Sequence, residues 1–442
     1  MENTTELGQL LSKALQEQIE EPESVSQMEQ AIRKELLEIG RQALSEWLRD
    51  AAAEQPERTL RCPHCGQEAQ YERRREGQLR TVLGVVRYRR AYYRCQYCGK
   101  GHYPLDQALG LRLNAMSAEL ERLAGMTGVH MPFAQGSALF AELTLVGLSD
   151  QSLDKAAQAY GAEVEQVEQD WQEEARDEEA LLRRKREERA PLRLYGAVDA
   201  TKVHLRGETD DPWRDLKLGA WFEARGRPPK QPDGEWRIVA EEVTYYADLC
   251  PSREFSNLLW ATGIQRNAQL ARELVFLGDG AEWIWNIVAE NFPHAVQILD
   301  WFHACEYLMP VAKAAFDEEG QQEAWVEEIK TALWEGRLDE AIAACWDLAD
   351  AQREEDPAEK AATYFQKNRQ RMDYPTYRAQ GYHIGSGTIE SAAKQIGSQR
   401  MKVPGARWNE QGARRVSKAR AAFLSGQWPS LATRRAHLPL AA

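Results

Sequence analysis

Three acidic residues stand where a folded chain could bring their carboxylates together. Asp279 follows the apolar run 275–277, a pattern that predicts a buried strand, a turn and then a helix. Asp199 lies inside a second predicted strand, 192–205, where an unpaired carboxylate is costly to desolvate unless it meets a cation. Glu390 lies in the first turn of a predicted helix. Three such carboxylates could bind two Mg²⁺ or Mn²⁺ ions. A two-metal site of this kind stabilises the attacking and leaving oxygens when a phosphodiester bond is displaced.

Asp279 also has a simpler interpretation. Asp is a favoured N-cap residue, and the helix predicted from about Ala281 could be capped by it. The two roles are compatible, because one carboxylate can cap a helix and bind a metal. The metal site is favoured over a simple helix cap because Asp199 and Glu390 are expected to lie beside Asp279 in the folded chain.

The cysteines predict a second metal site. Four of the seven form two Cys-x-x-Cys-Gly knuckles, Cys62 with Cys65 and Cys95 with Cys98. Four thiolates match the tetrahedral preference of structural Zn²⁺, and the alternating segment 81–95 predicts a β-hairpin that brings the knuckles together. We therefore expect a zinc ribbon. A thioredoxin-like redox motif is the weaker alternative, because no βαβ pattern surrounds the cysteines; alternative ligands are His64 and His102.

The charge of the chain is unevenly distributed. The net charge of −13 by itself argues against a nucleic-acid binder. Basic residues nevertheless dominate the segments 73–94 and 367–442, and the local field is what a phosphate backbone meets. A solvated basic helix face is the alternative. The residues predicted to contact DNA are Arg89, Arg90, Lys394, Arg400, Lys402 and Arg407.

Strand and helix patterns predict a multidomain α+β protein. Three strands in a meander, followed by alternating helices and strands, give the order of an RNase H-like α/β core. Residues 146–161 have the spacing of a helix-turn-helix, although periodicity alone cannot separate it from a plain helical bundle. The predicted segments are an N-terminal helical region at 1–58, the zinc ribbon at 59–108, a helical DNA-binding region with a connector helix at 109–190, the first part of the RNase H-like core at 191–300, an all-helical insertion at 301–375, and the rest of the core with basic helices at 376–442.

Several short phrases resemble one known family. They are CPHCG with CQYCG, RYRRAYYRC, PLDQALGL, DATKVH, LGDGAEWIWNI, ILDWFHACEYL, YRAQGYHIGSGTIES and RMKVPGARW, in this order between about residues 60 and 424. The sequence resembles the bacterial insertion-sequence DDE transposases of the ISKra type. The resemblance implies Asp199, Asp279 and Glu390 as the acidic triad, a helical insertion before Glu390, and Asp300 and His303 as residues that support the site or the DNA. One departure is Ala200, where the family more often has glycine, and it should not disturb metal binding.

The resemblance implies a DNA transposase that binds terminal inverted repeats through its ribbon and the helical region that follows. Strand cleavage and strand transfer would then proceed without a covalent protein intermediate, which makes Ser386 and Ser391 poor nucleophile candidates. The expected partners are double-stranded DNA, both transposon ends and target, and further copies of the chain in a synaptic dimer or larger assembly. The alternatives are a domesticated RNase H-like DNA nuclease and a catalytically inactive zinc-ribbon DNA-binding regulator.

The chain contains no apolar run of about 18 residues, so we expect no membrane segment. Its acidic, amphipathic N-terminus is not typical of a signal or transit peptide. We expect a cytoplasmic, nucleoid-associated protein.

Overall fold

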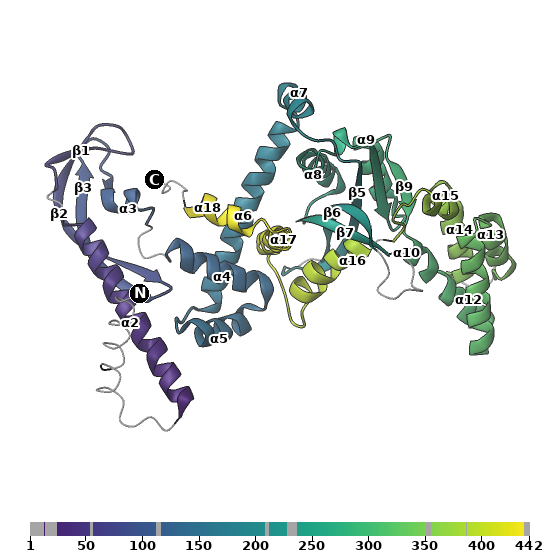
Figure 1. Ribbon diagram of the computed structural model, residues 1–442, viewed down its shortest axis with the longest axis horizontal. Coiled ribbons are helices and arrows are strands. Elements are labelled where there is room, and N and C mark those ends of the chain that lie inside the picture. The colour runs from purple at the N-terminus through teal and green to yellow at the C-terminus, as the bar shows by residue number, and fades with distance from the viewer. Residues whose placement is uncertain are drawn as a thin grey trace. The chain divides into compact units, whose positions relative to one another are not determined.

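The computed structural model describes residues 13, 24–53, 56–111, 116–207, 212–227, 237–350, 355–385 and 387–436 (Figure 1). The chain forms two compact units. The first comprises Met1–Ala157 with Pro429–Ala442, and the second comprises Gln158–Trp428. Of the helical region expected at 1–58, residues 1–12, 14–23 and 54–55 lie outside the described residues, as does Ser386.

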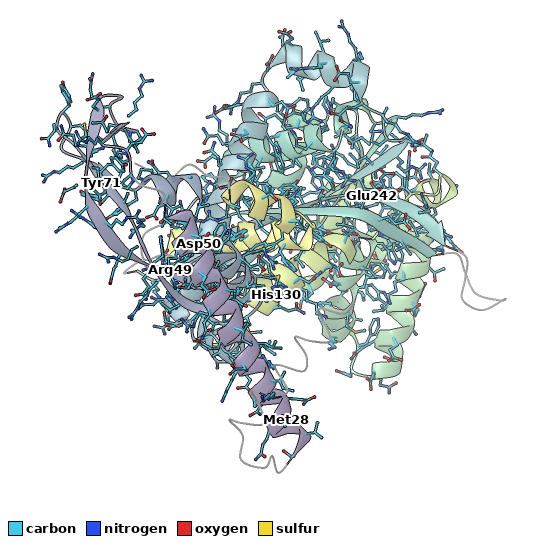
Figure 2. The ribbon with its side chains drawn as sticks, turned by 60° about the vertical axis from the view of Figure 1, so that its left-hand side comes forward. Met28, Arg49, Asp50, Tyr71, His130 and Glu242 are labelled. Atoms are coloured by element: carbon cyan, nitrogen blue, oxygen red, sulfur yellow. The ribbon has the colours of Figure 1, made fainter. Side chains whose placement is uncertain are left out.

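The first unit contains a four-stranded antiparallel sheet in the order β1-β2-β3-β4. The long hairpin of β2 and β3 pairs Leu79 with Val86 and turns at Val82 and Leu83. Helix α2 packs on β3 through Leu48 (Figure 2, where Met28 and Asp50 mark its two ends). The elements are α2 (Val25–Ala51), β1 (Thr59–Arg61), β2 (Glu68–Thr81), β3 (Gly84–Cys95), β4 (Gly101–His102) and α3 (Pro104–Ala108).

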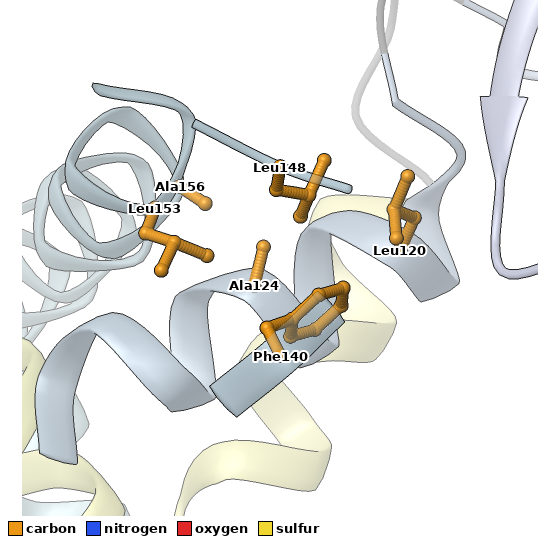
Figure 3. Close-up of a cluster of buried hydrophobic side chains, with 6 residues drawn as sticks. All are labelled: Leu120, Ala124, Phe140, Leu148, Leu153 and Ala156. Atoms are coloured by element: carbon orange, nitrogen blue, oxygen red, sulfur yellow. The ribbon is translucent and has the colours of Figure 1, made fainter. Parts of the chain in front are cut away.

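Three helices form a separate small core in the first unit. They are α4 (Ala118–His130), α5 (Phe133–Thr144) and the start of α6 (Asp150–Glu174). Figure 3 shows the buried side chains that join them: Leu120, Ala124, Phe140, Leu148, Leu153 and Ala156.

Residues 146–161, which have the spacing of a helix-turn-helix, do not form two helices joined by a turn. The first of these residues form the turn between α5 and α6, and α6 then continues through Gly161 without a break. A Cβ atom at Gly161 would lie 2.1 Å from the carbonyl oxygen of Arg415, so the glycine serves close helix packing rather than a turn.

The second unit contains a five-stranded sheet in the order β7-β6-β5-β8-β9. Strands β5, β6 and β7 form an antiparallel meander, while β8 and β9 run parallel to β5. The four residues at the end of β8 are all buried, as is typical of a parallel strand covered on both faces. The elements are β5 (Arg193–His204), β6 (Trp213–Arg227), β7 (Arg237–Asp248), α8 (Ser252–Gln265), β8 (Glu273–Gly278), α9 (Glu282–Asn291) and β9 (Val296–Leu299).

A run of helices follows β9, as the sequence predicts. It comprises α10 (Trp301–Glu306), α11 (Leu308–Ala315), α12 (Glu319–Trp334), α13 (Leu338–Asp347), α14 (Pro357–Asn368) and α15 (Tyr374–Ala379), with a short 3₁₀ turn before α15. The chain then returns to the sheet through α16 (Gly387–Ala392), the π-helix η3 (Ala393–Met401) and α17 (Glu410–Leu424), and ends in α18 (Trp428–Ala436). No helix in these described ranges is long and apolar enough to cross a membrane.

The boundary between the units falls inside α6 rather than near residue 190. Residues of α6 beyond Gln158 form ion pairs with α17, such as Glu165 with Arg415 at 3.0 Å. Helix α7 (Glu178–Glu187) is fixed by Arg184, which reaches the side chain of Gln265 at the end of α8 at 2.8 Å. Charged side chains on the connector helices therefore join them to the second unit.

Candidate functional site

The four knuckle cysteines form one tight cluster. Their ligand atoms all lie within 4.8 Å of one another, with Sγ–Sγ distances of 3.7 Å for Cys62 and Cys98 and 3.5 Å for Cys65 and Cys95. Sulfurs bound tetrahedrally to one zinc ion would lie about 3.8 Å apart. The cluster could therefore hold a structural metal such as zinc.

The hairpin and the knuckle glycines explain this geometry. Strands β2 and β3 pair Ala69 with Cys95, which brings the second knuckle beside the first. Gly66 and Gly99 adopt φ values of +73° and +71°, which glycine reaches without strain. A backbone N–H from Cys98 donates to the Cys95 sulfur and lowers the pKa of that thiol to about 7, which favours the metal-binding thiolate. His102 lies outside the cluster and stacks on Tyr93 at 5.6 Å.

Removal of one knuckle ligand should release the metal. We expect Cys65→Ser to reduce bound zinc from about one ion per chain to a small fraction of that and to lower the stability of the β1–β4 sheet. Elemental analysis and thermal unfolding measure both effects. Cys345→Ala, at a buried cysteine outside the cluster, is the control; equal zinc content in the two variants would contradict a four-cysteine site.

Asp199 and Asp279 meet at one edge of the second sheet. The parallel strands β5 and β8 pair Ala197 with Leu277, and each aspartate lies two residues beyond that pair. Neighbouring strands are about 4.8 Å apart, so Asp279 leaves the end of β8 beside Asp199, which remains in β5 and pairs with Leu218 of β6. This edge is the carboxyl end of the parallel strands, where open α/β sheets place their ligands.

Asp199 is partly buried in a negatively charged environment. Its Oδ1 atom accepts a hydrogen bond from the N–H of Ala200 at 2.6 Å. Burial is the main cause that raises the pKa of Asp199 to about 6, and the charges of Asp279 and Glu390 act in the same direction. The charges of Asp279 and Glu390 therefore both oppose the ionisation of Asp199.

This pKa shift has a consequence for stability in buffer without added Mg²⁺. Because the pKa of Asp199 is about 6 when folded, against an ordinary value of 3.8, protonation favours folding. That contribution is complete below about pH 3.8 and is lost as the pH rises through about 6. We expect Asp199→Asn to be more stable than the wild type at pH 8, by on the order of 3 kcal/mol, and equally stable at pH 4. Chemical denaturation at the two pH values measures the difference; an Asn variant less stable at pH 8 would contradict the desolvated site.

Asp279 occupies the turn after β8, but it does not cap α9. The helix begins at Glu282 with Ala281 at the N-cap position, and Asp279 Oδ1 accepts the N–H of Ala281 at 3.0 Å. This is the local bond by which Asp side chains stabilise turns. Gly280 has a φ of +90°, and the Asp279 carbonyl oxygen accepts the Tyr364 hydroxyl at 2.6 Å.

Glu390 approaches from another element. It lies exposed in the first turn of α16, and the following π-helix η3 packs against β5. A Cβ atom at Gly397 would lie 3.0 Å from Thr201 Cγ2, and Lys402 Nζ donates to Thr201 Oγ1 at 3.0 Å. Contacts two residues beyond Asp199 therefore position the segment that carries Glu390. The helix becomes a π-helix at Ala393, so Lys394, four residues after Glu390, does not share an α-helical face with it.

Asp300 and His303 also belong to this edge of the sheet. Asp300 is 1% exposed; it caps α10 by accepting the N–H of His303 and donates its own N–H to the Gly278 carbonyl at 2.9 Å. It thereby ties the ends of β8 and β9 together. Among the groups that affect the pKa of Asp199, His303 acts against the larger effect of burial, and its Nδ1 lies 3.2 Å from Glu306 Oε2.

The carboxylates do not form a closed ligand set in this structure. Within the described parts of the chain, the four cysteines are the only group of three or more His, Cys, Asp or Glu residues whose ligand atoms lie within 4.8 Å. The oxygens of Asp199, Asp279 and Glu390 are the kind of donor that Mg²⁺ and Mn²⁺ bind.

Two of the six predicted DNA-contact residues are wrong, because their side chains are buried. Arg90 is 0% exposed and donates to Asp106 at 2.8 Å; it shares the inner face of β3 with Val86 and Tyr88. Arg400 is 1% exposed, with its guanidinium 4.9 Å from the ring centre of Trp408. The exposed members of the set are Arg89, Lys394, Lys402 and Arg407.

The sequence patterns did not identify Tyr364, Thr201 or Gly397. Tyr364 reaches Asp279 from a helix 85 residues later, so no local spacing could have indicated it. Gly397 is visible in the sequence as a glycine inside a helical pattern, which is a recognised sign of close packing. No protein-family model matches the chain, and a search of the curated proteins found no significant match.

Proposed function

We propose that this protein is a DDE-type DNA transposase of an insertion sequence. It would bind terminal inverted repeats and catalyse metal-dependent strand cleavage and strand transfer through Asp199, Asp279 and Glu390. The observation that carries the proposal is the placement of Asp199 and Asp279, each two residues beyond the last pair of the parallel strands β5 and β8, with the Glu390 charge contributing to the raised pKa of Asp199. The family resemblance of the segments around them points to the same chemistry.

The sheet supports an RNase H-like catalytic core. Its order is β7-β6-β5-β8-β9, with an antiparallel meander and two further strands parallel to β5. A meander followed by alternating helices and strands is the order of elements from which the sequence predicts such a core. The helices α10–α14 would then be an insertion between the second aspartate and the glutamate. This is the arrangement that the resemblance implies.

The donor set fits Mg²⁺ or Mn²⁺. Burial and neighbouring charge oppose ionisation of Asp199, and a bound divalent cation would relieve both. When bound, two such ions would supply activation of the attacking oxygen and stabilisation of the leaving oxygen. The protein's part is to hold Asp199 through the Ala200 N–H and Asp279 through the Ala281 N–H, and to present Glu390 from α16.

Exposed basic side chains support DNA as the substrate. Lys394, Lys402 and Arg407 follow Glu390 in the chain and are exposed. On β3, exposed Arg87 and Arg89 alternate with buried residues, which gives the ribbon a basic outer face. Phosphate contacts of this kind position DNA without reading its sequence.

The decisive experiment uses the DNA that flanks the gene. Inverted repeats located there would serve as substrates for purified protein with Mg²⁺, both as intact ends and as pre-cleaved 3′ ends. We expect cleavage of the first and joining of the second to a target duplex. A nuclease would cut without joining, and a regulator would bind without either reaction; both results would contradict the transposase proposal.

A further inference from the structure

Tyr364 of α14 contacts the turn that carries Asp279. Its hydroxyl donates to the Asp279 carbonyl oxygen at 2.6 Å. At Gly280, a Cβ atom would lie 2.7 Å from ring atom Cε2 of Tyr364 and 3.0 Å from Nδ2 of Asn368. The turn therefore has a tyrosine ring and an asparagine amide directly against its backbone.

Tyr364 is itself firmly held. Its ring stacks on Tyr307, with ring centres 4.0 Å apart and planes 12° from parallel. The His303 ring lies edge-on to both tyrosines, at 5.7 Å from Tyr307 and 6.2 Å from Tyr364. Asn368 donates to the Tyr364 carbonyl oxygen at 3.0 Å. The run of helices after β9 is joined to the turn after β8 by three residues, here called the aromatic brace: the stacked rings of Tyr307 and Tyr364, and the amide of Asn368.

Two hydrogen bonds restrict the conformation of Asp279. The Tyr364 hydroxyl fixes the peptide group between Asp279 and Gly280, and the Ala281 N–H fixes the carboxylate. Without the hydroxyl, Gly280 gives this turn more conformational freedom than any other residue would. Groups that orient a metal ligand in this way affect metal affinity although they never touch the ion.

We propose that Tyr364 is a positioning residue that holds Asp279 ready for a divalent cation. The run of helices after β9 thus contacts the turn that carries Asp279 through the hydroxyl and the ring of Tyr364. This inference rests on the proposed metal site, but it concerns metal binding and not the reaction with DNA.

A purely structural role for Tyr364 would give a different result. Tyr364 and Gly280 line a cleft of about 790 Å³, so we expect water to reach the carbonyl freed by Tyr364→Phe and the stability cost to be small. Tyr377 provides a comparison, because its hydroxyl also lies within hydrogen-bonding distance of main-chain carbonyls, those of Gln370 at 3.3 Å and Gln297 at 3.4 Å. Neither carbonyl belongs to an acidic residue.

The experiment measures Mn²⁺ binding by electron paramagnetic resonance, with the cysteine-bound zinc retained. Binding that persists in Asp279→Asn is subtracted as non-specific. We expect Tyr364→Phe to weaken the remaining Mn²⁺ affinity about 10-fold and Tyr364→Leu to weaken it further, since outer-sphere changes typically cost 10–100-fold. Tyr377→Phe should leave it unchanged, and the two Phe variants should unfold at similar temperatures.

Wild-type Mn²⁺ affinity in Tyr364→Phe, with binding lost in Asp279→Asn, would overturn the inference alone. Absence of any Asp279-dependent Mn²⁺ binding in the wild type would overturn it together with the proposed metal site. Asp279-dependent Mn²⁺ binding without DNA cleavage or joining would refute only the proposed function, and the Tyr364→Phe affinity would still decide the role of the brace.

Discussion

Asp279→Asn is expected to slow metal-dependent DNA cleavage by on the order of 1,000-fold while DNA binding survives. Metal-held charge stabilisation is worth several kcal/mol in the transition state, and each 1.36 kcal/mol is a factor of ten. Asn keeps the size of Asp, and its Oδ1 can still accept the Ala281 N–H. The turn should therefore persist, and the loss should appear in the cleavage rate and not in the dissociation constant for the end DNA.

The matched control is Asp215→Asn. Asp215 lies on β6 opposite Lys202, with which it forms an exposed ion pair at 2.8 Å. The chemical change is identical and the residue belongs to the same sheet, so cleavage should stay within about twofold of the wild type, because exposed pairs contribute little. Full Mg²⁺-dependent cleavage by Asp279→Asn, or equal losses in both variants, would remove Asp279 from the acidic triad.

The main parts of this site could be predicted because their signals are local. An apolar run that ends in Gly-Asp-Gly determines where β8 stops, and the strand around Asp199 has the same kind of local signal. The pairing of Ala197 with Leu277, which brings the two aspartates to one place, joins distant segments and has no such local signal. The knuckle cysteines, by contrast, are a local signal. The first strand of their hairpin, β2, was harder to see because its many charged residues obscure the alternation.

What could not be predicted depends on contacts between distant segments. Charge alone cannot tell an exposed arginine from a buried one, although Arg90 falls on the same side of the β3 alternation as Val86. Nothing near Gly161 shows that the Arg415 backbone will pack against it and that α6 will continue. The hydrogen bond from Tyr364 to Asp279 exists only because the helical segment folds back onto the sheet.

A second large effect is expected away from the acidic site, at Lys418. This lysine is 1% exposed on α17, and its ammonium group contacts Glu168 of α6 and, at 2.8 Å, Asp248 at the end of β7. Lys418→Met keeps the length of the side chain but removes the ammonium partner of the buried Glu168 carboxylate. Asp248 then keeps its ion pair with Arg414, at 2.8 Å. Breaking a buried ion pair in this way costs about 3–5 kcal/mol. For a unit of this size we expect the unfolding temperature to fall by about 10 °C.

Lys418→Met is expected to destabilise the protein because it leaves buried carboxylate charge uncompensated, and not because the ion pair itself is strongly attractive. Two further variants separate these causes. Lys330→Met removes an ammonium group from an exposed pair with Glu327 at 2.9 Å and should change stability by less than about 0.5 kcal/mol. Adding Glu168→Gln and Asp248→Asn to Lys418→Met should restore much of the loss, because the buried groups then carry no charge. If Lys418→Met were as mild as Lys330→Met, Arg414 and water would have to compensate the two carboxylates, and the connection of α6 and α17 to the β7 edge would not depend on the buried ammonium group. The triple variant measures how much of that connection is packing alone.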